Sequence, residues 1–356
     1  MQNVVRQICL GVIGAAALLA QAAPSATHVI ASTVPANGDV NPYGIVIVPT
    51  TVGNLTAGNI LISNFNNSAN LQGTGSTIVQ ITPGGTQSLF AWINADALPG
   101  SCPGGVGLTT ALAALPSGWV VVGSLPTTDG TSATAQAGCL LVLDQWGDVV
   151  ETIANEWING PWDMTAIQQG SQAFLFVSNV LNGTVAGGGS IVSEGTVIRI
   201  TLDLPSTGAP TVSSIVTIGS GFSERTDPAA LVIGPTGLGL ASDDTLYVAD
   251  SLNNRIAAIP DALTATGSAG TGTTVKMGRP LNDPLGLTIA KTGNIQTVNG
   301  NNGLFVGTTP SGNTSAIALL DASGKPPGAG ALFGLVDSGK GVYYVDDATN
   351  TLNIFR

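Results

Sequence analysis

Residues 235–260 read PTGLGLASDDTLYVADSLNNRIAAIP, and this stretch predicts three short strands separated by two tight turns. A proline precedes the apolar run 237–240, which is typical of a strand buried on both faces. Asp243 and Asp244 suit the first turn, because aspartate side chains bond the nearby backbone. Residues 246–248 and 256–259 are apolar runs bounded by turn residues, which is a strand pattern. The stretch therefore predicts antiparallel β-structure with short connections.

Weaker copies of this pattern recur along the chain, and such recurrence indicates a repeat architecture. A Pro-x-Gly motif that opens a strand occurs at residues 42–44, 103–105, 235–237 and 284–286, with Pro161-Trp162-Asp163 as a variant. We predict the second strand of each copy at 60–62, 119–122, 174–177, 246–248, 304–306 and 342–345. We predict the third at 78–81, 140–143, 197–200, 256–259, 317–320 and 352–355. Six copies predict six blades.

Residues 235–260 resemble one NHL repeat, on the strength of Pro235, Gly237, Leu238 and the runs 246–250 and 253–256. The resemblance implies an all-β fold, a six-bladed β-propeller whose four-stranded antiparallel blades surround a central channel. Residues 27–33 read as a lone strand ahead of the first blade, whereas the last blade, 331–356, has only three strands. We therefore expect the N-terminal strand to complete the last blade and close the ring.

Residues 1–22 predict a secretory signal peptide. Arg6 gives a positive start, residues 8–20 are apolar, and Ala20-Gln21-Ala22 is an A-x-A cleavage site. The apolar run is short for a membrane span, although a retained N-terminal anchor is the alternative. We expect residues 23–356 to form a single exported domain, periplasmic or extracellular, without a further membrane span.

Two cysteines, Cys102 and Cys139, remain after the predicted cleavage. Paired cysteines in an exported protein favour a disulfide. The alternative is a pair of thiol metal ligands, but neither a CxxC spacing nor a nearby histidine accompanies them.

Charged residues make up 9% of the chain, against roughly 25% in typical soluble domains. Loss of residues 1–22 removes Arg6 and no acidic residue, so the remaining net charge is −12. This charge argues against nucleic acid as a partner, because such binding needs a clustered basic face. It suits either an ordinary secreted surface or a protein that works in acid. We expect a monomer.

Familiar catalytic motifs are missing from the sequence. His28 is the single histidine and lies on the predicted closing strand, which excludes zinc sites with several histidines. The sequence contains no GxSxG, P-loop or HExxH motif. The remaining candidates are oxygen ligands.

Four oxygen-bearing residues lie at or near the predicted strand openings. Asn41 and Asp283 stand directly before an opening proline, Asp227 precedes Pro228, and Asp163 follows Pro161 by two residues. Such oxygens could converge at one mouth of the channel and hold Ca²⁺, which takes six to eight of them. Gluconolactonase-like propellers, which share the predicted fold type, use a central Ca²⁺ for lactone hydrolysis. The alternative is that these residues start turns.

Two further groups of residues are candidates for a structural or binding role. Polar residues end the predicted second strands and are expected to bond the backbone of the following turn: Asn64, Ser124, Asn179, Asp250, Thr308 and Asp347. Trp157 and Trp162 flank the opening of the third blade beside Asp163. They are a candidate sugar- or peptide-binding pair, with core packing as the alternative.

The sequence favours a non-enzymatic binding module that holds a protein, peptide or glycan. The alternative is a Ca²⁺-dependent hydrolase or lyase with its site in the channel, built from Asn41, Asp163, Asp227 and Asp283. A propeller that holds a quinone cofactor ranks last, because it needs basic groups and the chain has only 10.

Overall fold

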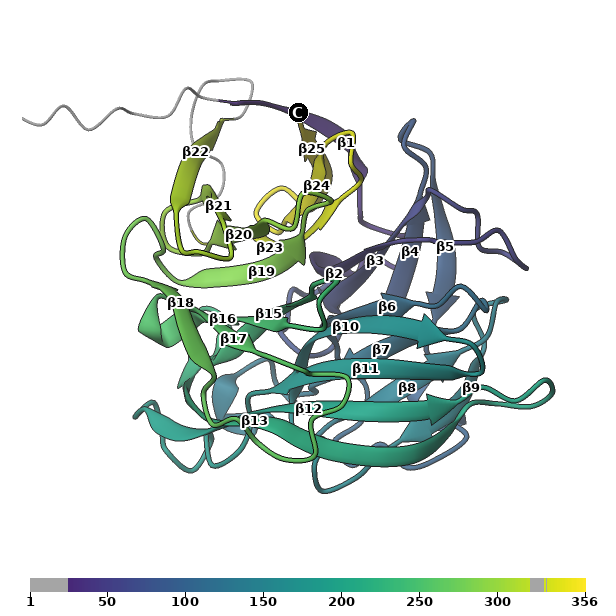
Figure 1. Ribbon diagram of the computed structural model, residues 1–356. Helices are drawn as coiled ribbons and strands as arrows, with labels where there is room; N and C mark the ends of the chain where they lie inside the picture. Colours follow the sequence, from purple (N-terminus) through teal and green to yellow (C-terminus); the bar gives the residue numbers. More distant parts are fainter. Residues whose placement is uncertain (1–24, 321–329, 331) are drawn as a thin grey trace, which may run out of the picture.

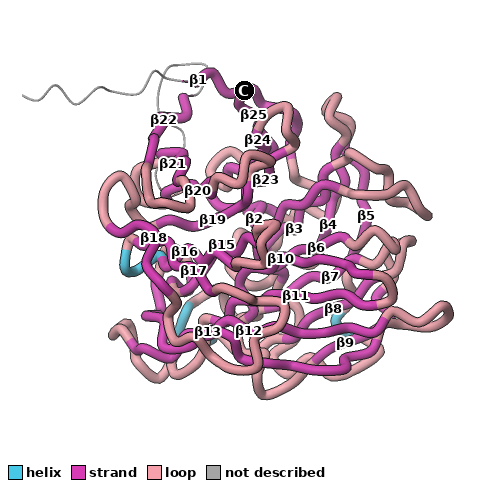
Figure 2. The backbone as a smooth tube through the Cα atoms, viewed as in Figure 1, coloured by secondary structure: helices cyan, strands magenta, loops and turns pink. Residues whose placement is uncertain are grey.

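The computed structural model describes residues 25–320, 330 and 332–356. The predicted signal peptide, 1–22, lies outside the described residues. Figure 1 shows sheets arranged radially around a central axis, and Figure 2 shows that strands and loops make up nearly all of the chain. None of the described helices is long and apolar enough to cross a membrane.

The six predicted blades are present. In blades one to five the first strand in the chain lies nearest the axis, and the later strands follow outward. Blade one contains β2 (Val40–Ile47), β3 (Ile60–Asn66), β4 (Thr77–Ile81) and β5 (Gln87–Trp92). Blade two contains β6 (Leu108–Ala114), β7 (Val120–Ser124), β8 (Cys139–Leu143) and β9 (Val149–Ile153). Blade three contains β10 (Pro161–Gln169), β11 (Gln172–Asn179), β12 (Val192–Asp203) and β13 (Thr211–Asp227), with β14 (Leu231–Ile233) as a fifth strand.

The second half of the ring repeats the arrangement. Blade four contains β15 (Pro235–Leu240), β16 (Leu246–Asp250), β17 (Arg255–Ile259) and β18 (Thr273–Met277). Blade five contains β19 (Pro284–Ile289), β20 (Ile295–Asn299), β21 (Leu304–Thr308) and β22 (Thr314–Leu320). Blade six contains β23 (Leu332–Asp337), β24 (Val342–Asp346) and β25 (Thr351–Phe355), completed by β1 (Ser25–Ser32).

The N-terminal strand closes the ring as predicted. β1 pairs antiparallel with β25, and Thr27 lies opposite Phe355. Its first two residues also pair in parallel with β22 of blade five, where Ser25 lies opposite Leu319. Blades five and six therefore form one continuous eight-stranded sheet, visible at the top of Figure 1.

The apolar runs of the sequence correspond to strands that are buried on both faces. Every residue of β3, β7 and β8 is buried, because each lies in the middle of its blade and packs against the neighbouring blades. One core cluster, for example, joins Val121 and Leu140 of blade two to Leu175 and Ile198 of blade three. Such strands read as continuous apolar runs, which explains why they could be located in the sequence.

Blade five differs from the prediction by one strand. Residues 304–306, predicted as the second strand, belong to β21, which is the third. Residues 317–320, predicted as the third, belong to the outer strand β22. The true second strand, β20, contains Gln296 and Thr297, so it lacks an apolar run.

Two strand openings also differ from the motif. Blade two opens at Leu108, and residues 103–105 lie in the preceding loop. Blade six opens with Leu332-Phe333-Gly334, without a proline. Blade four begins at Pro235, where the motif predicts it.

The glycine of the opening motif lies where neighbouring inner strands approach each other. A Cβ added at Gly237 would clash with the backbone of Leu285, and one at Gly286 would clash with the carbonyl oxygen of Phe333. Glycine is therefore required by close approach of the inner strands. In blade three the same place holds Asp163.

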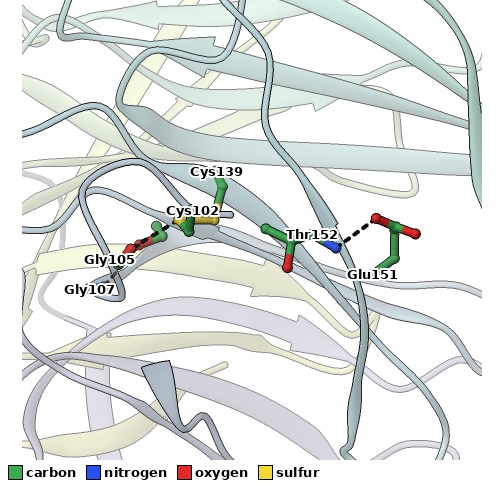
Figure 3. Close-up of a disulfide and its surroundings, with 7 residues drawn as sticks. Cys102, Gly105, Gly107, Cys139, Glu151 and Thr152 are labelled. Atoms are coloured by element: carbon green, nitrogen blue, oxygen red, sulfur yellow. Dashed lines mark hydrogen bonds between the residues drawn. A yellow bond between two sulfur atoms is a disulfide. The ribbon is translucent and has the colours of Figure 1, made fainter. Parts of the chain in front are cut away.

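The predicted disulfide joins Cys102 to Cys139, with an S–S distance of 2.10 Å and a Cα–Cα distance of 5.3 Å. Figure 3 shows it beneath the loop that precedes β6, where the Gly105 carbonyl oxygen lies 3.0 Å from Cys102 Sγ. It ties this loop to β8, which is fully buried. Closing a loop of this length stabilises the fold by roughly 3–4 kcal/mol in the chain-entropy model.

Candidate functional site

Four buried aromatic rings fill the axis of the propeller near the openings of the inner strands. Tyr43 stacks on Phe333 and Phe65, with ring centroids 3.9 Å and 4.7 Å away. Trp162 meets Tyr43 and Phe65 edge-on, at 5.7 Å in both cases. Tyr43, Trp162 and Phe333 are each the middle residue of an opening triplet, so the ring architecture brings them together. We call these four residues the aromatic plug.

Two cavities meet at Phe333, a member of the plug. The first, the mouth pocket, lies at the face where the inner strands begin and has a volume of about 290 Å³. The second, the channel cavity, is also about 290 Å³ and is lined by all six inner strands beyond their openings. Phe333 and Leu285 line both cavities, so they form part of the wall between them.

The mouth pocket contains an ion pair supplied by the additional hairpin of blade three. Arg225 and Asp227 lie two residues apart on β13, and Arg225 Nη2 is 2.7 Å from Asp227 Oδ2. Asp227 Oδ1 accepts hydrogen bonds from the N–H groups of Ala229 and Ala230, at 2.8 Å and 3.2 Å. Asp227 therefore holds the β13–β14 turn and orients Arg225 at the same time.

Asp283 faces the same pocket from the start of blade five. Its backbone is left-handed, with φ of 56°, and its N–H donates to Asn254 Oδ1 at 2.6 Å. Its carbonyl oxygen accepts the Gly300 N–H at 2.7 Å. Within the part of the chain that the structure describes, no group donates a hydrogen bond to the Asp283 carboxylate. The backbone is thus fixed while the carboxylate stays available to a ligand.

The pKa of Asp283 is raised to about 6. Burial is the main cause, because it disfavours the charged form, and the negative charge of Asp227 adds to it. The positive charge of Arg225 acts in the opposite direction. The side chain is therefore a carboxylate at neutral pH that takes up a proton readily.

Asp347, in the turn after β24, belongs to the same face. Its pKa is raised to about 7 by burial and by the charge of Asp346. The charges of Asp347 and Asp227 both act on Tyr43, whose pKa is raised chiefly by its own burial. Two carboxyl groups of this face therefore act on Tyr43 of the plug.

The four predicted metal ligands are distributed over this region in different ways. Asp227 and Asp283 line the mouth pocket, whereas Asp163 lines the channel cavity. Asn41, at the start of β2, hydrogen-bonds Tyr43 through its side chain, and its N–H donates to Asn350 Oδ1 at 2.6 Å. Its own Oδ1 is buried without a partner among the described residues.

The donor set at the mouth is poorer than Ca²⁺ requires. Among residues 25–320, 330 and 332–356, no three Asp, Glu, His or Cys side chains gather as a metal-binding group. Both oxygens of Asp227 are already engaged by the turn and by Arg225. Calcium binding by Asn41, Asp163, Asp227 and Asp283 stays a prediction, and we derive no chemistry from it.

The two predicted ligand-binding tryptophans lie in different environments. Trp162 is only 2% exposed and belongs to the plug, so it does not form an exposed pair with Trp157. Trp157 is 52% exposed in the turn before β10. Core packing, the alternative interpretation, describes Trp162, while a binding role for Trp157 stays a prediction.

The polar residues at the ends of the second strands are buried and hold neighbouring backbone. Ser124 Oγ accepts the Gly107 N–H at 2.9 Å, and Asn179 Oδ1 accepts the Asn159 N–H at 2.9 Å. In blades five and six this position is held by Asn299 and Asp346, which lie opposite the opening residues Pro284 and Leu332, and not by the predicted Thr308 and Asp347.

Asp163 is the only ionisable side chain that lines the channel cavity within the described chain. Its Oδ2 accepts the Leu238 N–H from blade four at 2.8 Å. Burial raises its pKa to about 7, although hydrogen bonds from backbone N–H groups oppose the shift. The plug thus separates two carboxyl groups with raised pKa values.

Sequence reasoning missed Arg225, and it gave Asp347 only a structural role at the end of a strand. In Arg225-Thr226-Asp227 the two charged residues are two positions apart, so their side chains lie on one face of a strand. This pattern could have indicated the ion pair from the sequence. Its meaning depends on the β13–β14 hairpin, whose position no local pattern indicates.

No protein-family model matches the chain, and no curated protein matches it. It is similar to a solved structure of a catalytically inactive virginiamycin B lyase from Staphylococcus aureus with quinupristin, at a TM-score of 0.52 and 15% identity, covering 91% of this chain and 97% of that one. A gluconolactonase from Xanthomonas campestris gives a TM-score of 0.54 at 12% identity, covering 91% and 87%. The calcium-binding protein regucalcin from Agrobacterium tumefaciens gives 0.55 at 12% identity, covering 94% and 95%.

Identities this low show a shared fold and leave the chemistry open. The NHL resemblance of residues 235–260 stays a prediction. The comparisons and the sheet topology together show a six-bladed β-propeller, the fold that this chain shares with the solved structures of these three proteins.

Proposed function

We propose that the mouth pocket binds a small carbonyl compound and that the protein is a hydrolase or lyase in which Asp283 moves the proton. The observation that carries the proposal is the Asp283 carboxylate, which has a pKa of about 6 and shares a pocket with the Arg225–Asp227 pair. A pocket of about 290 Å³ suits a small ligand.

The two polar groups have complementary roles in this chemistry. A general base works best when its pKa lies near the working pH, and Asp283 meets this condition. Arg225 offers planar N–H donors to a carbonyl oxygen, where negative charge develops during the reaction. Asp227 keeps the guanidinium in place.

For hydrolysis of an ester or lactone, Asp283 takes a proton from water while the water oxygen attacks the carbonyl carbon. The bond from that carbon to the leaving oxygen breaks, and the leaving oxygen takes the proton back from Asp283. For a lyase, Asp283 removes a proton from the α-carbon, which is next to the carbonyl carbon. The leaving group then departs from the β-carbon as the double bond forms, and Asp283 gives the same proton to the leaving group. Both reactions need one base and one oxyanion donor.

The structural relatives favour these reaction classes. One of them is a lyase and another is a gluconolactonase, and they share this fold over about nine tenths of the chain. This support is a fold-level analogy, because one fold hosts many functions. The assignment therefore depends on Asp283 and Arg225 themselves.

A non-enzymatic module that binds a protein, peptide or glycan is the second candidate. Large exposed aromatic side chains favour it, because such rings bind sugars and peptides. They are Trp92, Trp146 and Trp157. Export to the periplasm or the extracellular space is part of either proposal and is supported by the disulfide.

The test compares Asp283→Asn and Arg225→Gln with a matched control, Asp261→Asn. Asp261 is also left-handed, with φ of 52°, but it is exposed and lies outside the pocket. A panel of small lactones, esters and β-substituted carbonyl compounds is screened by acid release and by ultraviolet absorbance of an unsaturated product.

We expect kcat of Asp283→Asn to fall by about 10²–10⁴-fold, the usual contribution of a general base, while Asp261→Asn stays at wild-type activity. In the wild type, kcat/KM should rise with pH and level off above about 6, because the base must be deprotonated. Equal activity in Asp283→Asn would remove it as the base. Saturable binding without turnover of any compound would favour the binding module.

A further inference from the structure

The channel cavity is closed at the plug and open at the opposite face of the ring. Residues at the plug end of its wall, such as Trp162 and Phe333, are buried. Residues at the far ends of the same strands, such as Ala166, Leu240 and Val336, are half-buried. Exposure therefore increases along each inner strand away from the mouth pocket, and a ligand would enter from the opposite side.

The wall of this cavity is aliphatic in its side chains and polar in its backbone. Side chains such as Leu112, Met164, Leu287 and Leu335 line it. Each inner strand is also the edge strand of its sheet, so one side of its backbone is not paired within the sheet. Edge strands have carbonyl and N–H groups that no strand of their own sheet pairs with. Near the plug some of these groups bond across blades, as where Thr236 Oγ1 donates to the Leu285 carbonyl oxygen at 3.1 Å.

Asp163 occupies a place that glycine fills in other blades. The third residue of the opening triplet is Gly44, Gly237, Gly286 and Gly334 in blades one, four, five and six. Blade three instead has a carboxyl group, which reaches blade four through the Leu238 N–H. Burying a carboxyl group is costly unless it is paired, so its presence at a glycine position needs a reason.

Among the residues that the structure describes, none that lines the cavity is a basic partner for the Asp163 carboxylate. From the elements packed against it, β6 contributes residues 112–114 and β15 contributes residues 236–240, none of which is ionisable. β19 and β23 contribute residues 285–289 and 333–336, again without charge. The carboxylate would therefore be stabilised by a cation that comes from outside the protein.

We propose that the channel cavity is a binding site for a primary alkylammonium ligand that enters from the face opposite the mouth pocket. The ammonium group lies on Asp163 and donates its other hydrogens to inner-strand carbonyl oxygens, since it carries three donors and no acceptor. The alkyl chain runs along the aliphatic wall toward the open end. At about 290 Å³, the cavity is at the small end of ligand pockets, which limits the ligand to a short chain.

The rival explanation is that Asp163 only braces blade three against blade four. Asp163→Asn distinguishes a ligand site from a structural brace, because the amide oxygen still accepts the Leu238 N–H while the negative charge is lost. Asp283→Asn, on the other side of the plug, is the matched control. Ala166→Leu narrows the open end and leaves the carboxylate unchanged.

The experiment is calorimetric titration of the full exported chain with hexylamine at pH 8, beside hexan-1-ol and hexanoate. We expect saturable binding of hexylamine, at least tenfold stronger than that of hexanol, and none of hexanoate. Affinity should fall at least tenfold in Asp163→Asn and in Ala166→Leu, and stay unchanged in Asp283→Asn. It should also weaken from pH 8 to pH 5 as Asp163 takes up its proton.

Equal binding to the wild type and to a folded Asp163→Asn would overturn the proposal, as would absence of binding to the wild type at millimolar hexylamine. Loss of binding in Asp283→Asn alone would place the ligand in the mouth pocket instead. If Asp163→Asn does not fold, undiminished binding to Ala166→Leu is the overturning result. The proposed hydrolase or lyase activity is independent of all of these outcomes.

Discussion

The mouth pocket and the channel cavity have nearly the same volume and share two wall residues, yet their walls come from different elements and carry different charges. The mouth pocket takes Arg225, Asp227 and Asp283 from a hairpin and a strand opening. The walls of the channel cavity are regular inner strands, and Asp163 is the single ionisable residue among the described residues that line it. In this ring, paired charges therefore come from loops and strand openings, whereas the inner strands form an apolar cavity with one isolated carboxyl group.

This contrast explains what each cavity can do. In the mouth pocket an arginine lies beside carboxylates, so a substrate can meet both a proton acceptor and an oxyanion donor. In the channel cavity a lone carboxylate meets backbone and aliphatic groups, so it can bind a cation but has no second group for catalysis. The aromatic plug keeps the two environments apart.

The largest expected effect comes from removing the plug. Phe333 is buried, stacks on Tyr43 and lines both cavities. Replacing a buried aromatic residue by alanine costs about 3–5 kcal/mol, so we expect Phe333→Ala to lose that much unfolding free energy in urea. Phe174→Ala, at a half-buried phenylalanine of β11, should lose clearly less.

Phe333→Ala also breaks the separation of the cavities. In this variant we expect Asp283→Asn to alter hexylamine binding, which it does not do in the wild type. A loss of less than about 1 kcal/mol would mean that the plug is not a packed unit.

A smaller effect concerns stability against pH. Buried carboxyl groups on both sides of the plug have raised pKa values: about 7 for Asp163, about 6 for Asp283 and about 7 for Asp347. A carboxyl group whose pKa is higher in the folded state contributes stability below its unfolded pKa, near 4, and loses it as the pH rises through the folded value. The fold should therefore be more stable at pH 5 than at pH 8.

Calorimetry checks this prediction, and we expect a melting temperature at pH 5 at least about 2–4 °C above that at pH 8, roughly the effect of 1 kcal/mol. Combining Asp163→Asn with Asp283→Asn should flatten part of the difference. A higher melting temperature at pH 8 would contradict both this assignment and the suggestion that the charge-poor surface suits acid.

The fold was largely predictable because its middle strands are buried on both faces. Continuous apolar runs located the second and third strands in five blades, and the missing fourth strand of the last blade led to ring closure by β1. The prediction was wrong for the second strand of blade five, because Gln296 and Thr297 interrupt the apolar run there.

The candidate site was predictable only in part. Asp227 and Asp283 were expected at a channel mouth because each precedes a proline, and both line the mouth pocket. Asp163 was expected at the same mouth. It lies two residues after the start of β10, and at that depth its side chain lines the channel cavity and not the mouth pocket. Arg225 was missed because its position depends on the β13–β14 hairpin, a tertiary feature without a local sequence signal.

The central claim is that Asp163 and Asp283, two carboxyl groups with raised pKa values, lie on opposite sides of the plug. The positive charge of Arg225 lowers the pKa of Asp283 and does not act on Asp163. Nuclear magnetic resonance titration of the protein labelled with ¹³C at aspartate Cγ tests it directly, with Asp163→Asn and Asp283→Asn to assign the signals. We predict pKa values of about 6 for Asp283 and about 7 for Asp163. Arg225→Gln should raise the pKa of Asp283 further and leave that of Asp163 unchanged. Titration of both groups near their ordinary value of about 4, or equal shifts of both in Arg225→Gln, would contradict the account.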